Sequence, residues 1–169
     1  MKSVLVSIQP KWCELIASGK KTVEVRKTKP KIEPPFKAYI YQTKHREHNG
    51  PTYSDGKVIG EFVCDDVTRI INFITHFGVE GRPERELNTI ARASCLDYMD
   101  MLGYLGTEKD GYAWHISDLV IYDQPKKLSE FCSYDVRIYV GENGFPMPTH
   151  AITRPPQSWC YVEEGGGAE

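Results

Sequence analysis

Residues 21–27, Lys-Thr-Val-Glu-Val-Arg-Lys, alternate cleanly between apolar and polar side chains. A period of two predicts a β-strand with Val23 and Val25 on one face and with Glu24 and Arg26 on the other. Such a polar face either meets water or lies in a partly desolvated place where the charges must pair. The buried case could be a purely structural ion pair. It could also be the floor of a site, with Arg26 holding an anion and Glu24 accepting N–H bonds from a nucleobase.

The segment before this strand predicts a strand and a short helix. Residues 3–8, Ser-Val-Leu-Val-Ser-Ile, are rich in β-branched residues and indicate a buried strand. Pro10 suits the first turn of a helix, where its missing N–H costs nothing. Apolar residues then recur with helical spacing at Trp12, Leu15 and Ile16. Gly19 would end this helix in the left-handed conformation.

The rest of the chain predicts further strands with helices at their joints. We expect strands at 36–43, 57–70, 112–122, 137–140 and 158–162, and a short helix at 128–132. The polar, turn-rich residues 45–56 predict a long loop that could be a lid or a binding loop. Because no regular strand–helix–strand rhythm appears, the pattern favours an α+β fold, a small β-barrel with short flanking helices.

Residues 71–110 predict a helical insert between strands. Pro83 would open its first helix, and Ser94-x-x-Asp97 resembles the capping box of a second helix that ends near Gly103. We expect one domain over residues 1–163 and a flexible tail at 164–169, since 169 residues suit a single domain.

The net charge of −2 hides a polarity. Residues 1–50 carry a net charge of +7 and the remainder −9, an asymmetry that hints at an anionic partner. The basic residues that could meet phosphates are Lys20, Lys27, Lys29, Lys31 and Lys37. A folded domain can also scatter such lysines over every face.

The cysteines and histidines indicate the cellular compartment and whether a metal site is expected. The five cysteines, Cys13, Cys64, Cys95, Cys132 and Cys160, are widely spaced and predict reduced thiols in a cytoplasmic protein. No apolar run is long enough to span a membrane or to form a signal-peptide core. His45-x-x-His48 falls in the predicted loop without a second ligand pair, so we expect no metal and no cofactor.

A family resemblance rests on Gly19-x-Lys21-x-x-Glu24-x-Arg26 behind a helix that bears Trp12. This pattern resembles the signature of ASCH domains, which share the PUA-like barrel. The strand 112–118 and the ending 154–162 (Arg-Pro-Pro-Gln-Ser-Trp-Cys-Tyr-Val) resemble a bacterial and phage-associated branch of that family, and Ser7-Ile8-Gln9-Pro10 before the helix strengthens the family resemblance. The resemblance implies a cleft between the barrel and the first helix that binds RNA or a modified base.

Some ASCH relatives are hydrolases, either ribonucleases or amidohydrolases that deacylate N4-acetylcytidine with a lysine, a threonine and a glutamate. Lys21 matches that lysine, but Glu24 stands where the threonine would be. An amine that attacks needs a lowered pKa, which a neighbouring carboxylate opposes, so Lys21 beside Glu24 favours an ion-paired binding site. A ribonuclease could use Glu24 or His115 as acid and base, with Lys21 and Arg26 on the phosphate. A lone strand histidine is nevertheless more often a core residue.

Three hypotheses follow: a domain that binds RNA or a nucleotide-like ligand, a hydrolase acting through Lys21 and Glu24, and a regulator whose insert 71–110 docks on a protein partner. The candidate ligand-binding residues are Gln9, Trp12, Lys21, Glu24, Arg26, Tyr41, His115, Ser117 and Ser158. Among them, aromatic rings would stack on a base, worth ~1–3 kcal/mol each. The amide of Gln9 and the serine hydroxyls would form hydrogen bonds to the edge of the base, or would instead form local caps and turns.

Overall fold

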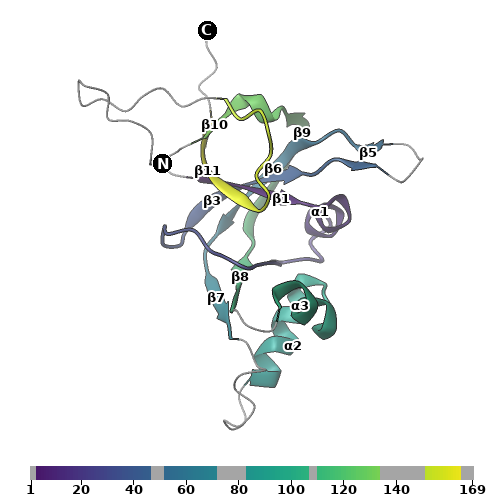
Figure 1. Ribbon diagram of the computed structural model, residues 1–169, viewed down its shortest axis with the longest axis vertical. Coiled ribbons are helices and arrows are strands. Elements are labelled where there is room, and N and C mark those ends of the chain that lie inside the picture. The colour runs from purple at the N-terminus through teal and green to yellow at the C-terminus, as the bar shows by residue number, and fades with distance from the viewer. Residues whose placement is uncertain (1–2, 47–51, 72–82, 107–109, 134–150, 165–169) are drawn as a thin grey trace, which may run out of the picture. The chain divides into compact units, whose positions relative to one another are not determined.

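The computed structural model describes residues 3–46, 52–71, 83–106, 110–133 and 151–164 (Figure 1). These residues combine mixed β-sheets with three α-helices, which confirms the predicted α+β class. They form two compact units. Unit 1 comprises described residues of 1–10, 37–61 and 120–169, and unit 2 those of 11–36 and 62–119.

Unit 1 is built on a six-stranded sheet. Its strand order is β10 (Phe131–Ser133), β11 (Trp159–Glu164), β1 (Ser3–Ile8), β3 (Phe36–Gln42), β6 (Lys57–Cys64) and β9 (Ser117–Lys126). β1 pairs parallel with β3 and antiparallel with β11, so it is a central strand, and all six of its side chains are buried. Such two-sided burial explains why its sequence is almost continuously apolar.

The core of unit 1 gathers side chains from most strands of this sheet. Its members are Leu5, Tyr39, Tyr41, Val58, Phe131, Ile152 and Val162. Ser7 is also buried, and its hydroxyl donates to the carbonyl of Pro156 at 2.7 Å. Its backbone N–H donates to the carbonyl of Ser158 at 2.9 Å. These two bonds fix the C-terminal segment against β1.

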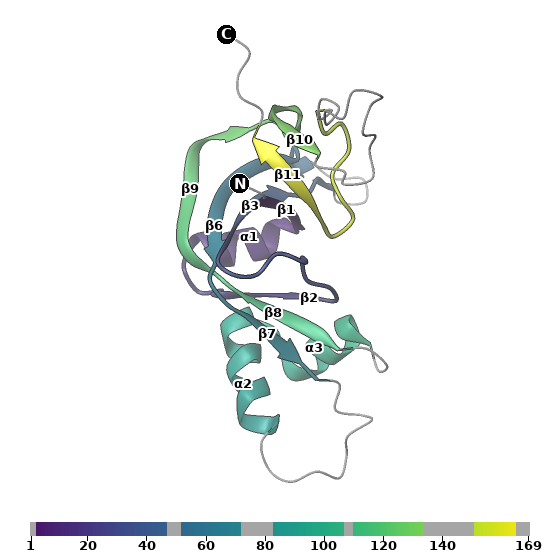
Figure 2. The same cartoon turned by 90° about the vertical axis from the view of Figure 1, so that its left-hand side faces the viewer.

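Unit 2 places helices on both sides of a three-stranded antiparallel sheet. The strand order is β2 (Val23–Arg26), β8 (Gly111–His115) and β7 (Val67–Ile70). α2 (Pro83–Ser94) and α3 (Tyr98–Leu105) lie on one side of this sheet, and α1 (Pro10–Ala17) lies on the other (Figure 2). Strand β2 is therefore covered on both faces, and all four of its residues are buried.

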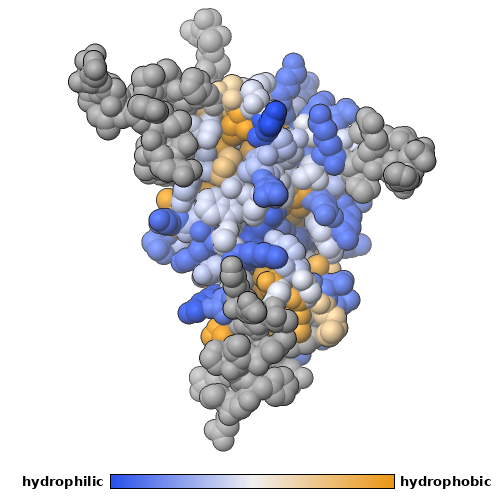
Figure 3. All heavy atoms as spheres, viewed as in Figure 1, coloured by the Kyte–Doolittle hydropathy of each residue, from blue (hydrophilic) through white to orange (hydrophobic). Residues whose placement is uncertain are grey.

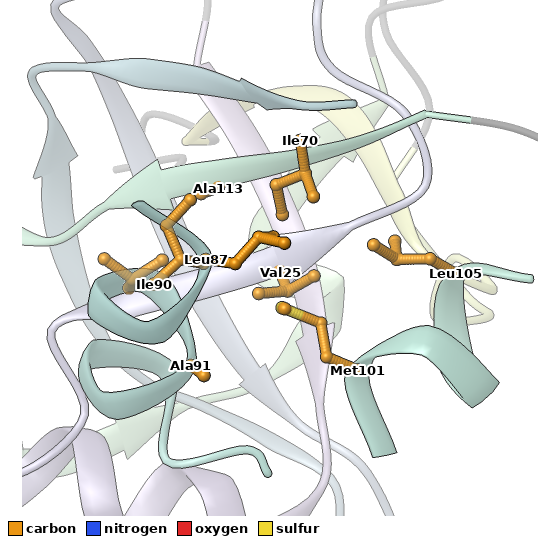
Figure 4. Packing of buried hydrophobic residues seen from close by; sticks show 9 residues of the cluster. Val25, Ile70, Leu87, Ile90, Ala91, Met101, Leu105 and Ala113 are labelled. Atoms are coloured by element: carbon orange, nitrogen blue, oxygen red, sulfur yellow. The ribbon is translucent and has the colours of Figure 1, made fainter. Parts of the chain in front are cut away.

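The apolar face of β2 forms the core of unit 2, as the alternation predicted. Val23 and Val25 pack with Leu87, Ile90 and Ala91 of α2, Met101 and Leu105 of α3, and Ile70 and Ala113 of the other strands. Figure 4 shows the labelled side chains of this cluster gathered between the sheet and the two helices. The predicted insert thus supplies one wall of a hydrophobic core, the dominant favourable term in folding.

Several expected boundaries are corrected by the structure. The expected strand 57–70 is two strands, β6 and β7, separated at Asp65 and Asp66, and the expected strand 112–122 breaks at Ile116 between β8 and β9. Asp66 lies in the break between β6 and β7, and its carbonyl accepts the backbone N–H of His115. The expected helix at 128–132 is a 3-10 turn, Leu128–Glu130, that leads into β10.

The segment 45–56 is not purely a loop. Its ends pair as a short antiparallel hairpin of β4 (His45–Arg46) and β5 (Thr52–Ser54), with a register irregularity. The expected strand 137–140, the side chains of His45-x-x-His48 and most of the expected tail lie outside the described residues.

The second helix of the insert begins later than expected. Ser94 is the last residue of α2, and its hydroxyl donates back to the carbonyl of Ala91 at 3.1 Å. The N-cap of α3 is Asp97, whose carboxylate accepts the backbone N–H of Asp100 at 2.7 Å. The left-handed backbone of Cys95, with φ of 55°, separates the two helices, so Ser94 cannot cap α3.

Hydrophilic side chains cover most of the face shown in Figure 3. The exposed large hydrophobic residues among those described are Ile71, Met99, Tyr104, Val120 and Ile121. Within the described part of the chain, no helix is both long and apolar enough to cross a membrane.

Candidate functional site

Lys21, Glu24 and Arg26 form one buried ion-paired cluster, called here the triad. Lys21 Nζ lies 3.3 Å from Glu24 Oε2, and Arg26 Nη2 lies 3.0 Å from Glu24 Oε1. The exposed fractions are 3% for Lys21, 7% for Glu24 and 6% for Arg26. Two cations thus share one carboxylate, and the triad itself carries a net charge of +1. Of the interpretations that the sequence left open, solvated outward-facing charges are excluded.

Lys21 precedes β2, and the turn between α1 and β2 brings its side chain to the polar face of that strand. Gly19, with φ of 72°, ends α1, and the N–H groups of Lys20 and Lys21 both donate to the carbonyl of Leu15 at 3.0 Å. A left-handed residue is common just after a helix, and glycine adopts it without strain. The chain then enters β2, where the strand alternation puts Glu24 and Arg26 on the face opposite Val25.

Lys21 also links β2 to the inserted helix. Its Nζ donates to the carbonyl of Ser94, the last residue of α2, at 2.7 Å. The neighbouring backbone N–H of Thr22 donates to the carbonyl of Ala93 at 2.8 Å. The C-terminal carbonyls of a helix have no partner within the helix, and here one of them accepts a charged donor.

Helix α1 covers the polar face of β2 with Trp12 and Cys13. Lys21 Nζ lies 5.2 Å from the centroid of the Trp12 ring and Lys11 Nζ lies 4.4 Å from it, both within cation–π range. Burial raises the pKa of the Cys13 thiol to about 12, and the negative charge of Glu24 adds to that rise. Cys13 is therefore a neutral side chain packed beside the triad.

Tyr104 of α3 stands at the Arg26 end of the triad, and the sequence did not indicate it. Its hydroxyl is hydrogen-bonded to the Arg26 side chain, and Lys27 Nζ lies 5.3 Å from its ring centroid. The residue is nevertheless 40% exposed. Burial raises the pKa of its hydroxyl, while the charge of Arg26 opposes that rise. No local spacing connects a residue of the insert with a strand so far back in the chain.

His115 lies on the other face of the sheet from the triad. In the register of β2 and β8, Val23 is opposite His115 and Glu24 is opposite Trp114. Residues that pair across strands share a face, so His115 lies on the side of Val23. It is exposed rather than part of the core, and its Nδ1 lies 2.6 Å from Asp65 Oδ1. That hydrogen bond holds the pKa of Asp65 below its usual value.

Ser117 belongs to the surroundings of His115 rather than to the triad. Its hydroxyl donates to the carbonyl of Val63 at 2.9 Å. It also helps to lower the pKa of Asp65, after the larger effect of His115. Because the Ser117 hydroxyl donates to a backbone carbonyl rather than to His115, this pair does not match a serine nucleophile with an adjacent histidine base.

The remaining candidates, Gln9, Tyr41 and Ser158, belong to unit 1. Gln9 is exposed at the end of β1, and Ser158 precedes β11, where its carbonyl accepts the N–H of Ser7. Tyr41 is 2% exposed and belongs to the core of unit 1. Its hydroxyl lies against Gly56, where a Cβ would come within 2.4 Å of the oxygen. Burial raises the pKa of this hydroxyl.

Comparison with known families decides the classification. The model of the ASCH domain matches residues 6–129. The chain belongs to the ASCH family. No curated protein matches it.

Solved structures of an ASCH protein from Zymomonas mobilis share the fold. One is 21% identical with a TM-score of 0.60, and the alignment covers 96% of this chain and 88% of that one. A Tyr→Phe mutant of the same protein is also 21% identical, with a TM-score of 0.60 and coverages of 98% and 93%. A Ser→Ala mutant is 20% identical, with a TM-score of 0.60 and coverages of 96% and 89%.

The range matched to the ASCH family contains the triad together with Trp12 and Tyr104, whereas Ser158 lies beyond it. Within the described part of this ASCH chain, no group of three or more His, Cys, Asp or Glu side chains is arranged to hold a metal ion. The triad offers charged donors on either side of a carboxylate, with an aromatic ring beside each cation. That arrangement suits recognition of a planar, anionic or hydrogen-bonding ligand.

Proposed function

We propose that this ASCH domain binds RNA or a modified nucleobase, as a PUA-like barrel whose ligand lies in a cleft between α1 and β2. The observation that carries the proposal is the pairing of both Lys21 and Arg26 with the single carboxylate of Glu24. Both cations are nine-tenths buried, so the triad holds one more positive than negative group away from water.

The charge of the triad favours an anionic ligand. Buried charges are expensive unless they are neutralised, and the triad holds a net positive charge. A phosphate, or the electron-rich oxygen of a nucleobase, would compensate it. The basic character of residues 1–50 acts in the same direction at longer range.

The Trp12 ring supports a base as part of that ligand. It is half-buried on α1 and faces the ammonium groups of Lys11 and Lys21. A base stacked on this ring would keep its edge within reach of the triad and its phosphate near Lys11. Stacking of this kind tolerates any base, whereas hydrogen bonds to Glu24 and Arg26 would select among bases.

The contacts of Lys21 count against the amidohydrolase alternative. A nucleophilic amine needs a free lone pair, and here the Lys21 nitrogen faces two acceptors, Glu24 Oε2 and the carbonyl of Ser94. The place of His115 counts against a ribonuclease that joins it to the triad, because the two lie on opposite faces of the sheet. For the insert, the buried apolar residues of α2 and α3 belong to the core of unit 2, which accounts for them without a protein partner.

Fluorescence anisotropy with a labelled single-stranded RNA of mixed sequence tests the proposal. We expect binding that weakens as salt rises, and a loss of about 5- to 150-fold in Trp12→Leu. Trp12→Phe should retain most of the affinity. Glu163→Gln, which alters an exposed carboxylate of β11, is the control for Glu24→Gln, since both change the charge equally.

Two results would contradict the proposal. One is the absence of any RNA binding in dilute buffer by the folded protein. The other is binding that Trp12→Leu and Glu24→Gln leave unchanged while both variants remain folded by circular dichroism. Release of acetate from N4-acetylcytidine, abolished in Lys21→Met, would instead support the amidohydrolase.

A further inference from the structure

Tyr104 and Lys27 form a second contact point beside the triad. The Tyr104 hydroxyl is bonded to Arg26, and the Lys27 ammonium lies over the ring at 5.3 Å from its centroid. Arg26 in turn pairs with Glu24, and Glu24 with Lys21, which lies next to the Trp12 ring. The triad therefore has an aromatic ring and an exposed lysine at each end: Trp12 with Lys11, and Tyr104 with Lys27.

Tyr104 lies on the exposed flank of α3, unlike the core residues of that helix. Met101 and Leu105 of α3 are buried in the core of unit 2, at 0% and 7% exposure, whereas Tyr104 is 40% exposed. Its hydroxyl is bonded to Arg26 and Lys27 lies beside its ring, while much of the ring surface remains open to water. An aromatic side chain has few rotatable bonds, so it loses little entropy when a planar group stacks on its exposed surface.

We propose that Tyr104 and Lys27 are a nucleotide-binding subsite, in which the ring stacks on one base of a single-stranded RNA and Lys27 contacts its phosphate. This inference rests on the proposed function and extends it. Two stacking positions, one at each end of the triad, suit a nucleotide chain rather than a lone nucleobase. The inserted helix α3 thereby takes part in binding through its exposed flank, while its buried face belongs to the core.

The salt dependence of RNA affinity tests the role of Lys27. For a single strand, each neutralised phosphate contributes about 0.7 to the slope of log affinity against log salt. Lys27→Gln should lower that slope by about 0.7. Lys57→Gln makes the same charge change at an exposed position of unit 1 and should leave the slope as in the wild type. An unchanged slope in Lys27→Gln overturns the phosphate contact.

Variants of Tyr104 separate stacking from a positioning role. Tyr104→Leu should weaken RNA binding about 5- to 150-fold, whereas Tyr104→Phe, which keeps the ring and loses the bond to Arg26, should stay within about 2-fold of wild type. Met99→Ala removes a 72% exposed side chain from the same helix and is the matched control. Equal losses in Tyr104→Phe and Tyr104→Leu would overturn stacking, because the hydroxyl would then be the part that matters.

Failure of this inference is distinguishable from failure of the proposed function. Wild-type protein that binds no RNA overturns both. RNA binding that falls in Trp12→Leu but not in Tyr104→Leu overturns the subsite alone. A cytidine 5′-monophosphate titration adds a further arm: if Tyr104→Leu weakens the RNA and the mononucleotide equally, a second stacking position for a chain is wrong.

Discussion

The ammonium group of Lys21 donates a hydrogen bond to the carbonyl of Ser94, 2.7 Å away at the end of α2. The same group pairs with Glu24, so one side chain joins the start of β2, the polar face of that strand and the inserted helix. Ser94 is fully buried, and its carbonyl would find no water if the lysine were removed. The triad is therefore a structural element as well as a candidate binding site, and its variants should differ in stability in a definite order.

Glu24→Gln should destabilise the protein more than Lys21→Met. Removing the carboxylate leaves Lys21 and Arg26 as buried cations without their shared partner, a change that typically costs about 3–5 kcal/mol. Lys21→Met keeps the Glu24–Arg26 pair and loses a charged hydrogen bond, worth about 1–3 kcal/mol. Urea unfolding measures both free energies, with Glu163→Gln as a surface control expected to stay within about 0.5 kcal/mol of wild type. The opposite order would show that Arg26 alone cannot neutralise Glu24.

Local patterns predicted the elements that depend on neighbouring residues. The strand at 3–8, the helix that begins at Pro10 and ends before Gly19, and the two faces of β2 are all confirmed. Each follows from periodicity or from one residue with a special backbone preference. The α+β class followed in turn from the irregular order of these elements.

Contacts between distant segments could not be read from such patterns. The alternation put Glu24 and Arg26 on one face, but nothing local indicated that Ser94 or Tyr104 would reach the triad. A lone strand histidine is more often a core residue, but His115 is exposed. Asp65, in the break after β6, lies beside the His115 ring. Ser94 was expected to cap α3, whereas the N-cap is Asp97. The choice depended on the backbone of Cys95, which tertiary packing determines.

The cap of α3 is the next prediction. Asp97 accepts the backbone N–H of Asp100 at 2.7 Å, and α3 contributes Met101 and Leu105 to the core of unit 2. Asp97→Ala should therefore lower the free energy of unfolding by about 0.5–2 kcal/mol. Asp97→Ser, which keeps an oxygen acceptor, should recover most of the loss. Urea unfolding followed by far-ultraviolet circular dichroism makes the comparison, and equal stability of the alanine and serine variants would rule out this cap.

Glu61 should make unit 1 less stable in acid. Burial alone would raise its pKa, but hydrogen bonds from Lys37 and Tyr122, at 2.7 and 2.5 Å, together with the charges of Lys37 and Lys126, lower it below the usual value. Because the pKa is depressed in the folded state, the stabilisation is complete above the ordinary pKa of about 4.5. It is lost as the pH falls through the lower folded value.

A comparison with Glu61→Gln isolates this effect. The difference in unfolding free energy between wild type and Glu61→Gln should be greatest near neutral pH and should shrink as the pH falls below about 4.5. Glu163→Gln, which removes an exposed carboxylate of β11, is the control for the loss of one negative charge. A Glu61→Gln difference that grows toward acid would mean that its pKa is raised rather than lowered.

The alkylation rates of the cysteines test whether α1 stays packed on the triad. Burial, reinforced by Glu24, raises the pKa of Cys13 to about 12, and burial with Asp65 and Asp66 raises that of Cys64 to about 12. Since the thiolate is the reactive form, both should be alkylated by iodoacetamide far more slowly than the half-buried Cys132. Mass spectrometry of each cysteine peptide over a time course gives the rates, and unfolding in urea should make them similar.

The same time course in Glu24→Gln tests the contact between Glu24 and Cys13. Removing the negative charge lowers the pKa of Cys13, which increases its thiolate fraction and its rate of alkylation. Cys64 is the internal control, because its pKa depends on Asp65 and Asp66 instead. Faster reaction of both cysteines would indicate general loosening. Faster reaction of Cys13 alone would place its thiol within the electrostatic reach of the triad, on the helix that also carries Trp12.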